Sequence, residues 1–345
     1  MLTKNNGGML NGNKILSQLV SVEILSPKID DTLWFFKEIL GLHEVGRKNR
    51  SVYLRGWEDW YTYSLKVTEA DTAGVREIVW RAYSEQDLID AVRIIDSYGL
   101  GLGWDNGEPE MGVGKGYKFI LPSGQIGKIV WEMKTWRATG DLRSGYKARP
   151  MKKPTKGVQA KDLSHIFLFA YNDQALSKTV ELLKKLTFKV NEILKEGNHM
   201  IAYWMAVNGT AHDLAIGLDP SGIPARLNHV TYNVDYADDL LRAADFYTDY
   251  GLEIVGGPLR HGITDSHSLY VKEPGGNVIE LLHGGYINTV PDWEPVTWDT
   301  KEDENRWLFY WGHVKEAFWH GSPLPPNKIS DELKEIVRQK LGAKI

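Results

Sequence analysis

The chain has 345 residues, of which 42% are hydrophobic and 25% are charged, and its net charge is -4. This composition is typical of a globular protein long enough for two or more hydrophobic cores. Because there is no basic excess, neither a nucleic acid nor an anionic membrane surface is expected as a partner. No apolar run reaches the roughly 18 residues of a membrane span, so a cytoplasmic protein is expected. The absence of cysteine excludes disulfides, thiolate metal ligands and cysteine nucleophiles.

The first predicted elements are an alternating strand from Leu19, a turn and an amphipathic helix that ends at a glycine, in LVSVEILSPKIDDTLWFFKEILGL. The segment HIFLFAYNDQALSKTVELLKKLTF begins at His165, has the same pattern and aligns with the first segment without gaps. The two starting residues are 146 positions apart. The chain therefore contains an internal repeat of a βα unit.

A second repeat follows the first within each half. The segment EIVWRAYSEQDLIDAVRIIDSYGL from Glu77 aligns without gaps with HVTYNVDYADDLLRAADFYTDYGL from His229, at an offset of 152 residues. The same offset pairs residues 120–128 with residues 272–280. These repeats predict four βα modules, each followed by further strands, and hence an α+β fold with two similar halves.

The repeat also sets the expected domain boundaries. We expect an N-terminal domain over residues 1–140, a linker over 141–161 and a C-terminal domain over 162–290. The linker is rich in glycine, proline and basic residues and has no clear periodicity. An aromatic tail and a C-terminal helix, which Ser330 can cap, are expected over 291–345.

Three candidate metal ligands, His165, His229 and Glu280, occupy matched places in the second half. Each histidine is the first residue of its predicted strand, and the glutamate ends the last strand of its module. Two imidazoles and one carboxylate are the ligand set of a mononuclear iron(II) oxygenase, which leaves positions open for substrate and dioxygen. A single strand histidine is usually structural, but the matched set favours a metal site. The first half cannot form one, because its aligned residues are Leu19, Glu77 and Lys128.

Three further polar residues fall near the predicted ligands. His212 belongs to the last strand of the third module, while His261 and Tyr270 belong to the loop and strand before the glutamate ligand. These residue types move protons or donate hydrogen bonds near neutral pH. The other histidines are expected to be structural or at the surface: His43, His199, His267, His283, His313 and His320.

With these residues in place, the sequence resembles the extradiol ring-cleaving dioxygenases of the vicinal oxygen chelate superfamily, most closely the catechol 2,3-dioxygenases. The segment from His261 to Glu280 resembles the family signature of a histidine, seven residues, Leu-Tyr, an acidic residue before proline, then glycine and glutamate. GPLRHG, LLRAADF, TAHDLAI and PDWEPVTW are also similar to family segments, so the resemblance runs from near residue 17 to about 320. Leu259 departs from the signature, which prefers a smaller or β-branched residue there, and this bears on the shape of the pocket.

The resemblance implies paired βαβββ modules that close into a barrel around a metal in the C-terminal domain, usually in a homotetramer. It implies iron(II), with manganese(II) as the alternative, bound by the three candidate ligands. It also implies an acid/base role for His212 and hydrogen bonds from His261 and Tyr270 to the substrate oxygens. The positions that match the ring pocket are Trp204, Ile263 and Thr264.

The implied reaction is extradiol cleavage of catechol or alkylcatechols by dioxygen to 2-hydroxymuconate semialdehyde. Three alternatives stay open at this point. The first is another extradiol specificity, of the dihydroxybiphenyl or homoprotocatechuate type. The second is a glyoxalase-like isomerase, and the third is a metal-free ligand-binding protein with the same modules.

Overall fold

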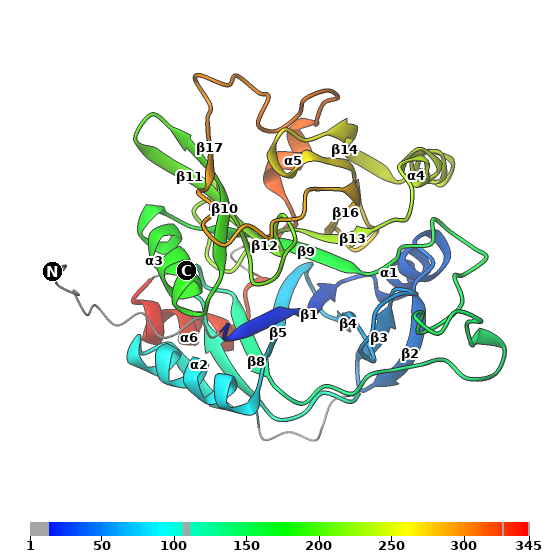
Figure 1. Ribbon diagram of the computed structural model, residues 1–345, viewed down its shortest axis with the longest axis horizontal. Helices are drawn as coiled ribbons and strands as arrows, with labels where there is room; N and C mark the ends of the chain where they lie inside the picture. The colour runs from blue at the N-terminus through cyan, green and yellow to red at the C-terminus, as the bar shows by residue number, and fades with distance from the viewer. Residues whose placement is uncertain (1–13, 106–110, 326–327, 344–345) are drawn as a thin grey trace, which may run out of the picture.

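The computed structural model describes residues 14–105, 111–325 and 328–343. Two mixed β-sheets form the centre of the molecule, one built from the first half of the chain and one from the second (Figure 1). The element order repeats four times as strand, helix and three strands. The predicted α+β fold of four βαβββ modules is therefore confirmed. Within the described residues, no helix has both the length and the apolar character that a membrane span requires.

The N-terminal sheet has the strand order β2-β3-β4-β1-β5-β8-β7-β6, with β1 and β5 antiparallel in its middle. Its strands are β1 (Leu16–Ser26), β2 (His43–Lys48), β3 (Ser51–Arg55), β4 (Leu65–Glu69), β5 (Gly74–Ala82), β6 (Gly101–Trp104), β7 (Gly116–Ile120) and β8 (Ile126–Val130).

The C-terminal sheet has the order β14-β15-β16-β13-β9-β12-β11-β10-β17, again with an antiparallel central pair, β9 and β13. Its strands are β9 (Leu163–Ala170), β10 (Lys189–Glu196), β11 (His199–Ala206), β12 (Leu214–Leu218), β13 (Leu227–Asn233), β14 (Glu253–Arg260), β15 (Ser266–Lys272), β16 (Val278–Gly284) and β17 (Val296–Asp299). The two ends of this sheet approach each other. The backbone N–H of Thr264, in the turn after β14, donates a hydrogen bond to the Glu192 side chain of β10.

Most helices pack on the outer faces of the sheets, but the short helix Glu316–His320 packs inside the C-terminal sheet through Phe318. Local capping accounts for the starts of several helices. The helices are α1 (Ile29–Trp34), which continues as the π-helical η1 (Phe35–Ile39), α2 (Glu85–Ser97), α3 (Asp173–Lys185), α4 (Asp238–Asp249), α5 (Glu316–His320) and α6 (Asp331–Leu341), with 3-10 turns η2 (Gly140–Leu142) and η3 (Ile263–Asp265). Asn172 accepts a hydrogen bond from Ala175 N (2.8 Å) at the start of α3. Ser330 caps α6 in the same way, through Leu333 N at 3.2 Å, as the sequence predicts.

One hydrophobic core joins the two halves. It contains buried residues of both sheets and of α1 to α4, and the fully buried Val337 brings α6 into the same cluster. A smaller apolar cluster lies inside the C-terminal sheet, beneath the tail, and includes Trp204, Tyr270 and Phe318. The first core stabilises the pairing of the modules, and the second borders the cavity described below.

Strand pairing corrects one counterpart that the ungapped repeat predicts. Val79 and Thr231 are equivalent because they pair with Lys128 and Glu280, and their antiparallel partners are Ser21 and His165. The first-half counterpart of His165 is therefore Ser21 and not Leu19. The error arises because the first helical segment spans Ile29–Ile39 while α3 spans Asp173–Lys185, two residues more, so an alignment that matches the helix ends displaces the strands by two. A two-residue shift keeps every side chain on the same face, so hydrophobic alternation does not reveal it.

Candidate metal centre and active site

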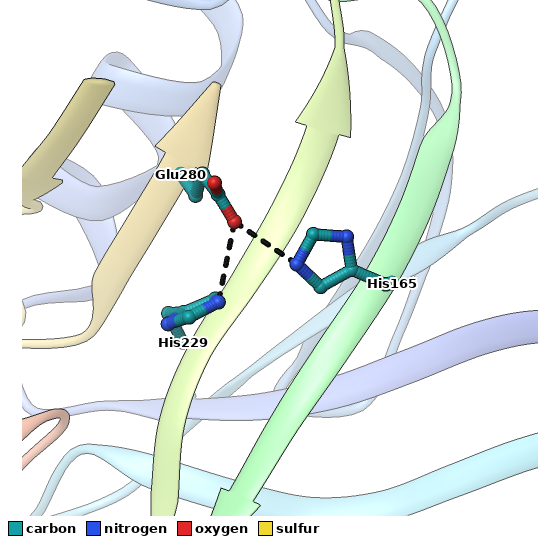
Figure 2. A group of neighbouring side chains, drawn as sticks. All are labelled: His165, His229 and Glu280. Atoms are coloured by element: carbon teal, nitrogen blue, oxygen red, sulfur yellow. Dashed lines mark ion pairs between the residues drawn. The ribbon is translucent and has the colours of Figure 1, made fainter. Parts of the chain in front are cut away.

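The three predicted metal ligands come together on one face of the C-terminal sheet. His165, His229 and Glu280 lie on β9, β13 and β16, which are neighbours in the sheet. Glu280 Oε2 lies 3.0 Å from His165 Nε2 and 3.2 Å from His229 Nε2 (Figure 2). All three side chains are buried, and their candidate ligand atoms lie within 4.8 Å of one another.

These distances fit a divalent metal held by the three residues. Imidazole nitrogens and carboxylate oxygens bind such ions at about 2.0–2.2 Å, so two ligands at right angles on one ion lie about 3 Å apart. The observed 3.0 and 3.2 Å separations match that spacing. The donor set is that of a facial triad, in which three protein ligands occupy one side of the ion. Among the described residues, this is the one group found with metal-site geometry.

The protonation states of His165 and Glu280 also suit metal binding, which requires neutral imidazoles and an ionised carboxylate. Burial lowers the pKa of His165, against the opposing effect of the Glu280 carboxylate. Burial alone would raise the pKa of Glu280, but the adjacent imidazoles His165 and His229 hold it well below its usual range. The Glu280 carboxylate is therefore ionised, as a metal ligand must be.

His212 lies beside the triad, but in the loop immediately before β12 and not on that strand as predicted. Its ring centroid is 3.9 Å from that of His165, with the planes tilted by 44°. Burial, followed by the proximity of His165, holds the pKa of His212 well below its ordinary value. A neutral imidazole in this position can accept a proton from a group bound at the metal face.

His261 and Tyr270 form a hydrogen-bonded pair next to the triad, with His261 Nε2 3.9 Å from Glu280 Oε1. The His261 Nδ1–H donates to the backbone carbonyl of Leu308, which leaves Nε2 to accept a hydrogen bond from the Tyr270 hydroxyl at 2.7 Å. Burial lowers the pKa of His261. Burial, with the nearby Glu280 charge, raises the pKa of Tyr270 well above its ordinary value, so the phenol stays protonated. The carbonyl that fixes the His261 tautomer belongs to the aromatic tail.

All nine site residues predicted from the sequence line one cavity of about 820 Å³, its mouth included. Trp204, Ile263 and Thr264 lie on its wall, as do the ligands and the three proton-handling residues. None of the six histidines expected to be structural borders it; His199, for example, is hydrogen-bonded to Asp173 at the surface. Sequence reasoning missed much of the remaining lining, which includes Phe167, Phe169, Leu194, Ala202, Gly217, Trp307, Leu308, Phe318 and Trp319.

Known proteins with similar sequences are named as ring-cleaving dioxygenases. The chain is 35% identical to a metapyrocatechase of Geobacillus stearothermophilus, over 91% of this chain and 96% of that protein. It is 32% identical, over the same shares, to a manganese-dependent 2,3-dihydroxybiphenyl 1,2-dioxygenase of Geobacillus genomosp. 3. Residues 184–281 match the family model described as the glyoxalase/bleomycin resistance protein/dioxygenase superfamily.

The chain belongs to the extradiol dioxygenases of the vicinal oxygen chelate superfamily. The predicted family resemblance is thus confirmed, and it favours the dioxygenases over the isomerases and metal-free proteins built from the same modules. Solved structures show the same fold. They include the 2,3-dioxygenase LapB from Pseudomonas sp. KL28 (TM-score 0.74, 23% identity, 83% of this chain and 98% of that chain). Homoprotocatechuate 2,3-dioxygenase from Arthrobacter globiformis also matches (TM-score 0.78, 21% identity, 92% and 95%).

In this extradiol dioxygenase, two residues that the sequence analysis did not single out hold the triad. Thr231 Oγ1 donates to Glu280 Oε2 at 2.6 Å and lies 2.8 Å from His165 Nε2. Asn228 Oδ1 lies 2.7 Å from His229 Nδ1, so this nitrogen donates and the other keeps its lone pair for a metal. Both are close to His229 in the sequence LNHVT, and that adjacency was the one available signal.

Glu192 on β10 anchors the loop that carries His261. Its Oε1 accepts hydrogen bonds from Thr264 N (2.7 Å) and the Tyr286 hydroxyl (3.0 Å), and its Oε2 accepts from Trp298 Nε1 (2.7 Å). The carboxylate is 2% exposed, and burial raises its pKa. Thr264 has a left-handed φ of 64°, which is unfavourable for a β-branched residue. A buried acceptor therefore fixes a strained backbone next to the proposed catalytic pair.

The N-terminal sheet has an ion-pair cluster at the equivalent place. Lys128, the counterpart of Glu280, has its Nζ 2.6 Å from Asp105 Oδ2 and 3.8 Å from Glu77 Oε1. Lys118 Nζ lies 3.0 Å from Glu77 Oε2. Glu77 is the counterpart of His229. The ammonium groups of Lys118 and Lys128 neutralise the carboxylates here, which would otherwise attract a metal cation. This half supports the fold and does not offer a second triad among its described residues.

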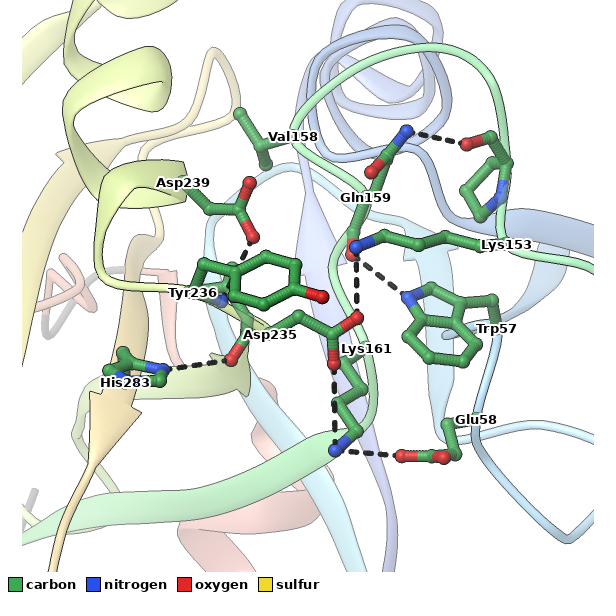
Figure 3. A network of polar contacts seen from close by, with 12 residues as sticks. Trp57, Glu58, Lys153, Val158, Gln159, Lys161, Asp235, Tyr236, Asp239 and His283 are labelled. Carbon is green, nitrogen blue, oxygen red and sulfur yellow. Dashed lines mark hydrogen bonds and ion pairs between the residues drawn. The ribbon is translucent and has the colours of Figure 1, made fainter. Parts of the chain in front are cut away.

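The predicted linker is tied to both halves outside the cavity. Lys153 Nζ lies 2.9 Å from Asp235 Oδ2, and Lys161 Nζ lies 2.8 Å from Glu58 Oε2 (Figure 3). Trp57 Nε1 donates to Gln159 O at 3.0 Å. None of these residues lines the cavity, so this network has a structural role in joining the modules.

Proposed function

We propose that this extradiol dioxygenase cleaves catechol or an alkylcatechol with dioxygen to give a 2-hydroxymuconate semialdehyde. The observation that carries the proposal is one apolar cavity in which the triad, His212 and the His261/Tyr270 pair all meet. The metapyrocatechase relative supports catechol as the core of the substrate. A ring-cleaving enzyme needs this combination of a metal face, a proton acceptor and hydroxyl-binding donors in a dry pocket.

We propose that His165, His229 and Glu280 bind iron(II), with manganese(II) as the alternative. The bound metal would lower the pKa of the catechol hydroxyls and hold both reactants next to each other on its open face. The same three ligands suit either ion, and the relative named as manganese-dependent keeps the second possibility open.

The proposed roles of the surrounding residues follow from their atoms. His212, a buried neutral imidazole beside His165, takes up the proton that the catechol hydroxyl loses and later returns it. Tyr270 is held as a protonated phenol by burial, and its hydroxyl, which here donates to His261 Nε2, would turn to donate to a substrate oxygen and steady negative charge there. His261 would hold the phenol in place beside that oxygen. Trp204 and Phe167 meet edge to face, with centroids 6.1 Å apart, and bound the space for the ring together with Ile263 and Thr264.

The overall reaction balances without an external reductant. Catechol and one dioxygen combine; the O–O bond and the ring carbon–carbon bond beside the diol break, and both oxygen atoms enter the product. The four electrons that reduce dioxygen come from the ring, which ends as an aldehyde and a carboxylate. No bound nicotinamide or flavin is therefore required.

Reconstitution with either metal tests the proposal. Metal-free protein should be loaded anaerobically with iron(II) or manganese(II), mixed with aerobic catechol and followed in the visible region for the yellow product. His229→Ala should lose both stoichiometric metal and turnover, whereas His199→Ala removes an exposed imidazole outside the cavity and should lose neither. Absence of yellow product with both metals, for catechol and alkylcatechols alike, contradicts the proposal.

The homotetramer and the cytoplasmic location expected from the sequence are part of this proposal. Exposed apolar side chains such as Tyr310 of the tail (71% exposed) and Ile287 just before it (80% exposed) are the kind of surface that a subunit interface covers. Light scattering of the purified protein at several concentrations tests the oligomer, and a stable monomer contradicts it.

A further inference from the structure

The tail crosses the two neighbouring strands β13 and β16 at the point where both begin. Helix α5 ends at His320, and the next two residues lie against β13. The Ser322 backbone N–H donates to the carbonyls of Leu227 and Asn228, each at 3.0 Å. The Ser322 side chain is fully buried. A tail residue 94 positions away in the sequence is thus attached to the sheet that carries the candidate metal ligands.

The Ser322 hydroxyl joins these two strands. It accepts a hydrogen bond from Val278 N of β16 at 3.0 Å and donates one to Asn228 O of β13 at 3.1 Å. The parallel ladder between the strands begins beside it, with the pair His229 and Val278. Glu280 lies two residues further along β16. One buried hydroxyl therefore links the backbones of the two strands next to two of the three candidate ligands.

The N-terminal sheet offers an internal comparison. Its strands β5 and β8 match β13 and β16 at the offset of 152 residues, and their ladder begins with Ile78 and Gly127. These two residues correspond to Val230 and Ile279, one pair beyond the start of the second-half ladder. The ladder of the C-terminal sheet is therefore one pair longer at the end where the tail lies, and the extra pair contains His229.

Two further contacts hold the tail segment in place. Arg226, which immediately precedes β13, donates through Nη2 to the His320 carbonyl, and its Nη1 donates to Asp219 Oδ1 at 2.6 Å. Gly321 has a left-handed φ of 56°, and a Cβ there would lie 2.8 Å from Asn228 Cα. Because a side chain at this position would meet backbone, the close approach of the tail to β13 requires glycine.

Asn228 connects this junction to a metal ligand. Its backbone carbonyl accepts hydrogen bonds from both the N–H and the hydroxyl of Ser322. Its side-chain Oδ1 accepts a hydrogen bond from His229 Nδ1 at 2.7 Å. Such a bond to the outer nitrogen of a histidine ligand orients the ring and strengthens metal binding. A displacement of the Asn228 backbone would therefore change the direction in which the His229 ring points.

We infer that Ser322 is a positioning residue for the metal centre, and that docking of tail residues 320–322 and metal binding stabilise each other. This inference rests on the proposed function, which places the metal at the triad. The hydroxyl keeps β13 and β16 at the spacing at which His229 Nε2 and Glu280 Oε2, 3.2 Å apart, can share one ion. Coupling of this kind is reciprocal, so the ion favours the docked tail by the same factor by which the tail favours the ion.

Manganese(II) binding to the metal-free protein tests the inference without turnover. Dissociation constants should be measured by equilibrium dialysis for the parent, Ser322→Ala and a matched control, Ser51→Ala. Ser51 is also buried, and its hydroxyl lies 2.7 Å from Thr68 Oγ1 in the N-terminal sheet. We expect Ser322→Ala to bind manganese(II) about tenfold more weakly, as for the loss of other groups that support a metal ligand. Ser51→Ala should bind the ion as the parent does, although it also loses a buried hydrogen bond.

Gly321→Ala is a second variant of the same contact. The added methyl group would push the tail away from Asn228, so this variant should weaken manganese(II) binding at least as much as Ser322→Ala. Binding as tight as in the parent for both tail variants overturns the inference. An equal loss of affinity in Ser51→Ala also overturns it, because the effect would then be a general loss of stability.

Hydrogen exchange measures the coupling in the opposite direction. Exchange of the peptide that covers residues 316–324 should be followed by mass spectrometry, with and without manganese(II). We expect the metal to slow exchange at the Ser322 N–H about tenfold in the parent. If metal and tail are coupled in this way but catechol is not cleaved in air, the inference stands and the proposed reaction fails. If catechol is cleaved but neither metal affinity nor tail exchange shows coupling, the reaction stands and the inference fails.

Discussion

Replacing Glu192 by glutamine should loosen the loop that carries His261 without removing the metal ligands. The carboxylate accepts three hydrogen bonds: one from the Thr264 backbone N–H, one from the Tyr286 hydroxyl and one from the Trp298 indole. In the glutamine variant the amide oxygen can still serve Thr264 and Tyr286, but the amide NH2 then faces the Trp298 indole N–H, donor against donor. Hydrogen bonds to charged groups contribute about 1.5–3 kcal/mol each. Relief of the buried charge offsets part of this loss, so the free energy of unfolding should fall by about 2 kcal/mol.

The assay compares unfolding in urea, metal content and kcat for Glu192→Gln and for a control, Glu253→Gln. Glu253 is an exposed residue on β14, and its carboxylate lies 3.8 Å from Lys272, a weak surface pair. We expect Glu192→Gln to keep its metal, lose stability and turn over more slowly, because the His261 imidazole no longer has a fixed position. Full stability and unchanged kcat in this variant would refute the reasoning, and so would equal effects in the control.

Three other predictions concern the buried charges and the proton acceptor. Lys128→Met should lower the free energy of unfolding in urea by about 3–5 kcal/mol, because Asp105 and Glu77 lose their buried cation. The metal content should not change. A loss below about 1 kcal/mol would show that the ion pairs of Lys128 do not stabilise the N-terminal sheet. Burial raises the pKa of Asp162 to about 7, from 3.8 in the unfolded chain, so its contribution to stability is complete below about pH 4 and is lost as the pH rises to about 7. Asp162→Asn should therefore be more stable than the parent at about pH 8 and show a flatter stability profile between these values; parallel profiles contradict the assignment. His212→Phe should retain metal but lose roughly 10²–10⁴-fold in kcat, as measured by the initial rate with catechol; an unchanged rate would remove its proton-transfer role.

The four modules could be predicted from the sequence, because strands and helices differ in the spacing of their hydrophobic residues and the same strand-helix pattern occurs four times. The three ligands were also accessible, since each falls at a matched place in the repeat. The first-half counterpart of His165 was wrongly predicted as Leu19 because a helix shortened by two residues shifts a strand by a full side-chain period. The alternation of hydrophobic and polar residues does not change with such a shift. The pairing of β1 with β5 identifies Ser21 as the counterpart.

Contacts between residues far apart in the sequence explain the parts of the site that the sequence did not indicate. Aromatic residues in the tail indicate burial, but nothing in their spacing says that they cover the second-half cavity. Glu192 looks like a polar residue of an ordinary alternating strand, and its role appears only when the two ends of the sheet meet. The tail residues that line the cavity are Trp307, Leu308, Phe318 and Trp319.

The stoichiometry and identity of the product test the central claim most directly. Metal-loaded protein should be supplied with a measured amount of catechol in an oxygen-electrode cell, and the product should be identified by its mass and visible spectrum. We expect one dioxygen to be consumed per catechol, no hydrogen peroxide to form, and a yellow semialdehyde whose ring is opened beside the diol. Oxygen uptake without ring opening, or a colourless dicarboxylate from cleavage between the two hydroxyl-bearing carbons, would contradict it.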